Sequence, residues 1–260
     1  MKLTLNATDE METLKFYPNF RFFMTNRGAE NEPMFDLPNY NSSTCDTKVE
    51  NGCNKWFSSE SAMNTNFIED FSAVCFMTVR DVARLHIGDS TPVALIQSAV
   101  GGTRVEAWMS KSAIVRASKL LNNTLPPPAS NAVNKVNVLY NAMVSPFNSM
   151  AVRAALWYQG EANADQIDPV SKIDYYTAYL GTMIETWREV KGMGDFSFFV
   201  VTLPPSQKNG TSCSLSMHHQ HTHTHTQTTT HIHHTQEHHL RLKLVEWKFE
   251  LRKLRLLYRQ

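Results

Sequence analysis

Between residues 20 and 203, short apolar segments alternate with segments in which apolar residues recur at helical spacing. The apolar runs that are short enough for strands are 20–25, 92–97, 152–158 and 196–203. Helical spacing is found in 73–86, 133–144 and 175–190. Because the two kinds of segment alternate, the pattern predicts parallel βαβ units and a layered α/β domain. Four strands are few for a doubly wound sheet.

The pattern changes after Gln207. Ten of the eleven histidines lie between His218 and His239, and residues 221–226 alternate His with Thr. A metal-binding tract is one interpretation, because neutral imidazoles bind Zn, Cu and Ni. We favour another, in which a CA dinucleotide repeat has been translated as His and Thr. We therefore expect a domain over 1–207, and a disordered low-complexity tract and basic tail over 208–260 that lie outside the fold.

Composition excludes some classes of protein. The chain is 42% hydrophobic, which is enough for a core, and its formal net charge of +1 gives no steering toward nucleic acid or membranes. No apolar run reaches the length of a transmembrane helix, and the first ten residues do not resemble a signal peptide. The chain nevertheless carries N-glycosylation sequons, which are typical of secreted proteins, at Asn6, Asn41, Asn122 and Asn209.

The cysteines favour an oxidising compartment without establishing it. Cys45 and Cys53 are close enough in sequence to close a small loop as a disulfide. Cys75 lies in an apolar run, so we expect it to be buried rather than reactive.

Two loops carry the candidate chemistry, one at 97–103 and one at 159–163. Each follows a predicted strand, so both should lie at the same edge of a parallel sheet, where ligands bind. Gly101 and Gly102 can present backbone N–H groups, and Gln159 and Asn163 can add side-chain donors. Together they predict an oxyanion hole. The alternatives are a tight glycine turn and a loop whose polar residues cap the next helix.

Three segments resemble the sialate O-acetylesterase family of SGNH-type hydrolases: VALIQSAVGGTRVEAWMS, LYNAMVSPF and ALWYQGEANA. The resemblance covers about residues 1–207. It implies a flavodoxin-like three-layer α/β/α fold and hydrolysis of O-acetyl esters on sialic acids or related sugars, without a cofactor or metal. It also implies a secreted or lysosomal enzyme that uses a serine nucleophile and a histidine base oriented by an acid.

The same resemblance assigns roles to residues of this chain. The Gly101 and Gly102 block would give a backbone donor to the oxyanion hole, and Gln159 the side-chain donor. Glu161 and Asn163 would shape the site, and Asn141 would support it from the preceding helix.

The chain departs from the family at both ends. The family's Gly-Gln-Ser-Asn-Met block, which follows the first strand, is absent, and Met1 resembles its last residue, so the nucleophile is expected just upstream. The Asp-x-x-His-Pro block that carries acid and base is also absent. We therefore expect a truncated, poorly stable and inactive chain that lacks the first strand of the sheet. A non-catalytic glycan-binding homologue and a metal-binding protein that uses the histidine tract remain alternatives.

Overall fold

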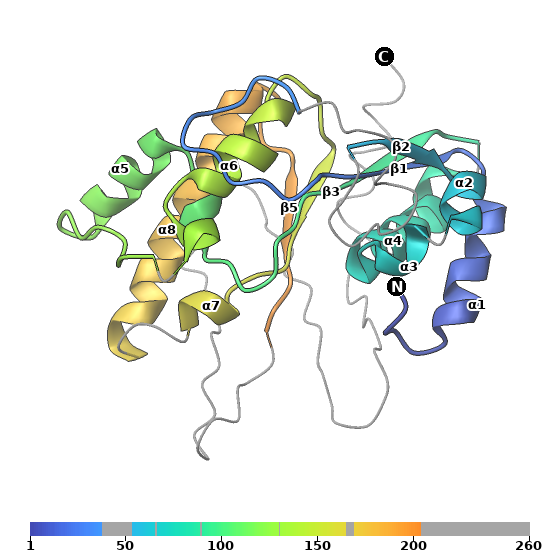
Figure 1. Cartoon of the computed structure of the whole chain (residues 1–260), viewed down its shortest axis with the longest axis horizontal. Helices are drawn as coiled ribbons and strands as arrows, with labels where there is room; N and C mark the ends of the chain where they lie inside the picture. The colour runs from blue at the N-terminus through green and yellow to red at the C-terminus, as the bar shows by residue number, and fades with distance from the viewer. Residues whose placement is uncertain (38–53, 66, 89, 130, 165–168, 204–260) are drawn as a thin grey trace.

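The computed structural model describes residues 1–37, 54–65, 67–88, 90–129, 131–164 and 169–203 (Figure 1). The strands among them are β1 (Phe20–Met24), β2 (Trp56–Ser58), β3 (Val93–Gln97), β4 (Ala154–Trp157) and β5 (Ser197–Val200). The α-helices are α1 (Ala7–Glu12), α2 (Ser59–Asn64), α3 (Phe67–Asp70), α4 (Ala73–Val82), α5 (Lys111–Leu120), α6 (Val138–Met143), α7 (Glu161–Ala164) and α8 (Pro169–Lys191). None of the described helices is both long and apolar enough to cross a membrane.

The described strands form two sheets. One has the order β2-β1-β3, with β1 parallel to β3 and antiparallel to β2. In the other, β4 and β5 are parallel. The four predicted strands correspond to β1, β3, β4 and β5, and their parallel pairing confirms the α/β class. Strand β2, which pairs with β1 in antiparallel fashion, was not predicted from the sequence.

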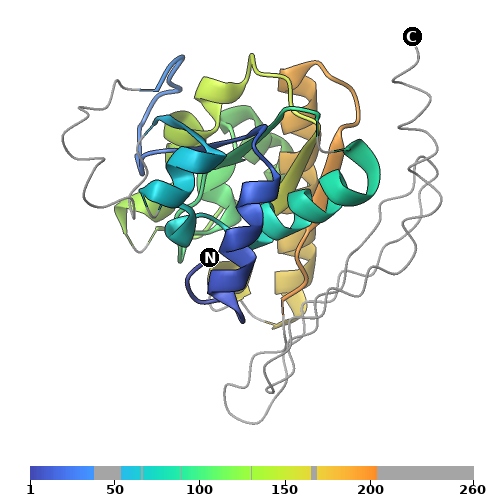
Figure 2. The same ribbon diagram turned by 90° about the vertical axis from the view of Figure 1, so that its right-hand side faces the viewer.

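Helices cover the strands on two sides (Figure 1). Helices α1 to α4 lie on the right of the strands in that view and α5 to α8 on the left. Figure 2, turned so that the first group faces the viewer, shows the blue α1 and the teal α4 in front of the strands. Each group of helices has its own hydrophobic cluster, one with β1, β2 and β3 and the other with Trp157 of β4.

Strand β1 carries buried aromatic side chains on both faces of its sheet, because successive side chains of a strand point to opposite faces. The ring of Phe22 packs edge-on against Phe71 of the first cluster, with 5.2 Å between centroids. The ring of Phe23 lies 5.9 Å from that of Phe147, on the segment that follows α6. The alternation in β1 therefore places a core residue on each face of the sheet.

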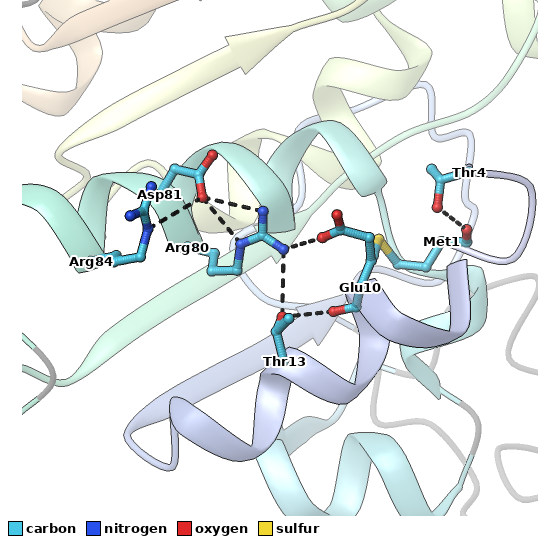
Figure 3. Close-up of polar contacts among 7 residues, drawn as sticks. All are labelled: Met1, Thr4, Glu10, Thr13, Arg80, Asp81 and Arg84. Carbon is cyan, nitrogen blue, oxygen red and sulfur yellow. Dashed lines mark hydrogen bonds and ion pairs between the residues drawn. The ribbon is translucent and has the colours of Figure 1, made fainter. Parts of the chain in front are cut away.

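Ion pairs attach α4 to α1 at the surface of the first cluster (Figure 3). The guanidinium of Arg80 contacts the carboxylate of Glu10 and lies 3.2 Å from a carboxylate oxygen of Asp81. The Oγ1 of Thr13 donates to the carbonyl of Glu10 at 2.7 Å. Of these contacts, the ion pair between Arg80 and Glu10 attaches α1 to α4.

Two predictions about elements need correction. The expected helix over 133–144 is divided, because Asn137 adopts a left-handed conformation (φ 71°) and α6 begins only at Val138. The strand predicted over 152–158 is shorter than expected, since β4 covers only Ala154–Trp157, and of these residues only Trp157 is buried. The amphipathic helix expected over 175–190 is confirmed within α8, where Tyr179 and Met183 are buried.

Several expectations fall on residues outside the described ranges. They are the disulfide between Cys45 and Cys53, the sequons at Asn41 and Asn209, and the tract and tail over 208–260. They stay predictions.

Candidate active site

The loops that follow β3 and β4 meet, although these strands belong to two separate sheets and not to the single parallel sheet expected from the sequence. The Nε2 of Gln159 donates to the carbonyl of Thr103 at 3.0 Å. The backbone N–H of Val105 donates to the Oδ1 of Asn163, also at 3.0 Å. These two bonds connect segments more than fifty residues apart and bring the glycine turn and the Gln-Gly-Glu-Ala-Asn segment into one site.

The glycine turn is open to solvent. Gly101 and Gly102 are exposed, and no heavy atom lies within 4 Å of the position that a Cβ would take at either residue. Gly102 has a φ of 71°, which side chains other than glycine rarely adopt. Its carbonyl accepts from the Nδ2 of Asn134 at 3.1 Å, and the Oδ1 of the same amide accepts from the N–H of Arg104 at 2.8 Å. One buried asparagine thus holds both sides of the turn.

Thr103 closes the turn on the side of the core. Its Oγ1 donates to the carbonyl of Val100 at 2.7 Å and accepts from the indole Nε1 of Trp108 at 3.0 Å. Trp108 is buried in the cluster of α5, α6 and α8. The packing of this tryptophan therefore fixes the position of the glycine turn.

The side-chain amide of Gln159 is fully bonded within the protein. Its Nε2 donates to Thr103, as above, and to the Oδ1 of Asn163 at 2.7 Å. Its Oε1 accepts from the hydroxyl of Tyr176 at 2.9 Å, and that hydroxyl accepts from the Nε1 of Trp157 at 3.3 Å. For Gln159 to donate to a substrate oxygen, one of its two N–H groups must exchange its present partner.

Glu106 is the acidic residue of the site that sequence reasoning did not single out. It is 1% exposed. Its carboxylate accepts from the Nδ2 of Asn163 at 3.2 and 3.0 Å and from the hydroxyl of Tyr175 at 2.5 Å. Its place in the block that carries the resemblance, three residues after Thr103, was a signal for it. Nothing in the periodicity of α8 distinguished Tyr175 from an ordinary core residue.

Burial keeps the tyrosines at the site protonated. Burial raises the pKa of Tyr175, and the Glu106 carboxylate that accepts its hydrogen bond raises that pKa further. Burial also raises the pKa of Tyr176, which serves Gln159. Both hydroxyls therefore act as hydrogen-bond donors at neutral pH.

Two other predicted site residues lie at the margin. Glu161 is exposed at the start of α7. Burial raises the pKa of Tyr158, and the nearby carboxylate of Glu161 raises it further. Asn141 is buried in α6, and its Nδ2 donates to the carbonyl of Glu30 at 3.0 Å, so it attaches the segment after β1. A supporting role at the site stays a prediction for both residues.

Ser98 and His86 do not form a catalytic pair. The Oγ of Ser98 donates to the carbonyl of Met143 at 2.9 Å. His86 lies in the π-helical turn 83–87, before β3, whereas the glycine turn follows that strand. Five residues of extended chain span roughly 16 Å, too far for proton transfer.

The remaining sequence-predicted positions are surface features. Asn6 and Asn122 are exposed and both have a positive φ, as is common for asparagine in turns. Within the described ranges, no three His, Cys, Asp or Glu side chains gather in a group that could hold a metal ion.

Comparisons with known proteins show which family the chain resembles. A family model described as "Carbohydrate esterase, sialic acid-specific acetylesterase" matches residues 75–244, which include both loops. The sialate O-acetylesterase of Pongo abelii is 27% identical over 186 residues, which cover 71% of this chain and 32% of that protein. The human sialate O-acetylesterase is 32% identical over 125 residues, or 47% of this chain and 22% of that protein.

One solved structure supports the fold. A carbohydrate acetylesterase from Xanthomonas citri superposes with a TM-score of 0.51 at 24% identity, covering 72% of this chain and 35% of the other. The present chain spans about a third or less of the length of these relatives. Because the family model matches more than half of it, the chain belongs to the carbohydrate esterase family of sialic acid-specific acetylesterases.

Proposed function

We propose that this chain supplies the ester-recognition part of a sialate O-acetylesterase-like hydrolase, which removes O-acetyl groups from sialic acids or related sugars. The observation that carries the proposal is the junction of the two loops through Gln159 and Asn163. It brings the exposed N–H groups of Gly101 and Gly102 close to a side-chain amide. Such a set of donors suits the negative charge that develops on the carbonyl oxygen during acyl transfer.

In this proposal, each hydrogen-bonding group of the site has its own role. The backbone N–H groups of the glycine turn donate to the ester carbonyl oxygen. The Nε2 of Gln159 joins them when the acetyl oxygen takes the place of the Thr103 carbonyl as its acceptor. Asn163 and Tyr176 keep the amide in position during that exchange, because each bonds an atom of the amide other than the N–H that is released.

We further propose that the 260-residue chain has no esterase turnover by itself. His86 is the single histidine of the described residues, and it lies at the other end of β3 from the glycine turn. Removing members of a catalytic triad leaves only the small residual rate that binding and the oxyanion hole provide. Efficient hydrolysis of an O-acetylated sialic acid by the purified chain would contradict this part of the proposal.

Sequencing the transcript beyond both ends of this reading frame tests the enzymatic assignment. A frame that encodes Gly-Gln-Ser-Asn upstream and Asp-x-x-His downstream would place the chain in a complete esterase. An in-frame stop immediately before Met1 would instead favour a non-catalytic homologue that binds acetylated glycans. That second function is favoured by the same site, which holds donors for an acetyl oxygen and, among the described residues, has no serine and histidine pair beside them.

The domain limits and the location of the protein are proposals as well. We propose that the esterase domain covers 1–207 and that 208–260 lie outside it. We also propose a secreted or lysosomal location, and the exposed sequons at Asn6 and Asn122 support it. Loss of apparent mass after treatment with an endoglycosidase, measured on protein from the native source, tests the location.

A further inference from the structure

A relay of three side chains connects the buried Glu106 with the glycine turn. Glu106 contacts Asn163, Asn163 contacts Gln159, and Gln159 contacts Thr103, next to Gly102. We propose that Glu106 is a positioning residue that determines which edge of the Gln159 amide faces the turn. The inference rests on the proposed function for the meaning of that orientation, but its geometry and its test do not depend on catalysis.

Glu106 sets the direction of the relay, because its carboxylate accepts every hydrogen bond named here. The hydroxyl of Tyr175 and the Nδ2 of Asn163 both donate to its carboxylate. Since the carboxylate accepts both of these bonds, the asparagine beside it presents its NH2 group. The Oδ1 of Asn163 therefore faces the other way, where it accepts from the N–H of Val105 and the Nε2 of Gln159.

The orientation passes from Asn163 to Gln159. Since the Oδ1 of Asn163 can only accept, the nearer atom of the Gln159 amide must be Nε2, at 2.7 Å. The hydroxyl of Tyr176 meets Oε1 on the opposite edge. One N–H group of Gln159 remains, and it is directed at the carbonyl of Thr103. This is the group that the proposed function assigns to the ester oxygen.

A neutral residue of the same shape at position 106 cannot enforce this direction. In the native chain, both carboxylate oxygens of Glu106 contact the Nδ2 of Asn163. In a Glu106→Gln variant, an NH2 group replaces one of these oxygens. Two donors then face each other, or the Asn163 amide reverses and loses its bonds to Val105 and Gln159. Either outcome releases the N–H edge of Gln159.

Hydrogen exchange of side-chain amides, followed by NMR on the uniformly 15N-labelled full chain, tests the proposal. We expect slow exchange at Nδ2 of Asn163 and Nε2 of Gln159, and exchange at least about tenfold faster at both in Glu106→Gln. Tyr175→Phe removes a donor but keeps the carboxylate, so the slow exchange should persist. Glu60→Gln, an exposed position in α2, is the matched charge control and should change neither signal.

Unchanged exchange of the Gln159 amide in a folded Glu106→Gln variant would overturn the proposal. Equal acceleration in Tyr175→Phe would also overturn it, because the packing of the site would then be responsible. If Glu106→Gln fails to fold, Glu106→Leu replaces it, since it removes the acceptor for the Nδ2 of Asn163 without introducing a donor. Slow exchange at Gln159 in that variant would contradict the relay. If the exchange measurements contradict the relay, the esterase assignment still stands. If the chain does not bind an acetyl ester, the exchange result still stands.

Discussion

Both N–H groups and the carbonyl oxygen of the Gln159 side-chain amide are hydrogen-bonded inside the protein. A donor held in this way is preorganised, but it must exchange one internal acceptor for the substrate oxygen. The net gain per exchanged bond is small, about 1 kcal/mol, so the binding of an acetyl ester should depend on the glycine turn as much as on Gln159. Gly101 and Gly102 are exposed residues, so we expect their N–H groups to bind the oxygen without that cost.

The thiol of Cys75 should resist modification in the folded chain. It packs against the cluster of α1 to α4, and burial raises its pKa to about 12, so little thiolate forms below pH 9. Labelling with iodoacetamide at pH 8, followed by mass spectrometry of the Cys75 peptide, should show slow labelling in buffer and rapid labelling in urea. Equal rates in the two conditions would show that this residue is accessible.

At the level of elements, the sequence predicted what local pattern encodes. Periodicity identified β1, β3, β4 and α8, and the polar loops identified the site, because both signals are local. It did not find β2, a three-residue strand whose pairing with β1 is a tertiary contact. The sequence pattern also did not identify Glu106. A single carboxylate in a turn is expected to be exposed unless its partners on α8 and in the loop after β4 are known.

Helix α8 should depend on its buried face. Met183 is fully buried in the cluster that includes residues of α5 and α6, whereas Val190 on the same helix is 49% exposed. We expect Met183→Ala to lower the free energy of unfolding by about 2–5 kcal/mol through lost contacts and a cavity. Val190→Ala, the control, should cost less than about 1 kcal/mol. Urea unfolding followed by circular dichroism measures both, and similar losses would refute the assigned packing.

At the level of the whole molecule, two hydrophobic clusters share the described chain, one on each side of the strands. Strands β3 and β4 belong to different sheets, and most of their residues are only partly buried. Strands with unpaired edges bury less apolar surface and are prone to association. This arrangement supports the expectation of a marginally stable chain, which stays a proposal until unfolding is measured.

Stability should fall at alkaline pH. The pKa values of Cys75, Tyr175, Tyr176 and Tyr179 are all raised, chiefly by burial, to about 12 for Cys75 and Tyr179. In the unfolded chain these groups titrate near their ordinary values, about 8.5 for Cys and about 10 for Tyr. Above about pH 9 the unfolded state therefore binds fewer protons than the folded state, and the free energy of unfolding decreases as pH rises toward 12.

Urea midpoints at pH 7, 9 and 10.5 measure this dependence. The midpoint should drop between pH 9 and 10.5, and the drop should be smaller in Cys75→Ala, which removes one of the four groups. A midpoint that stays constant across this interval would show that these side chains are not buried as the structure has them.

The central claim is that the joined loops bind an acetyl ester oxygen. Its most direct test is titration of the 15N-labelled chain with an O-acetylated sialic acid, with the unacetylated sugar as the control. With the acetylated sugar alone, we expect saturable shifts of the backbone signals of Gly101 and Gly102 and of the Gln159 side-chain amide. Equal shifts with both sugars, or shifts that avoid these three residues, would contradict it.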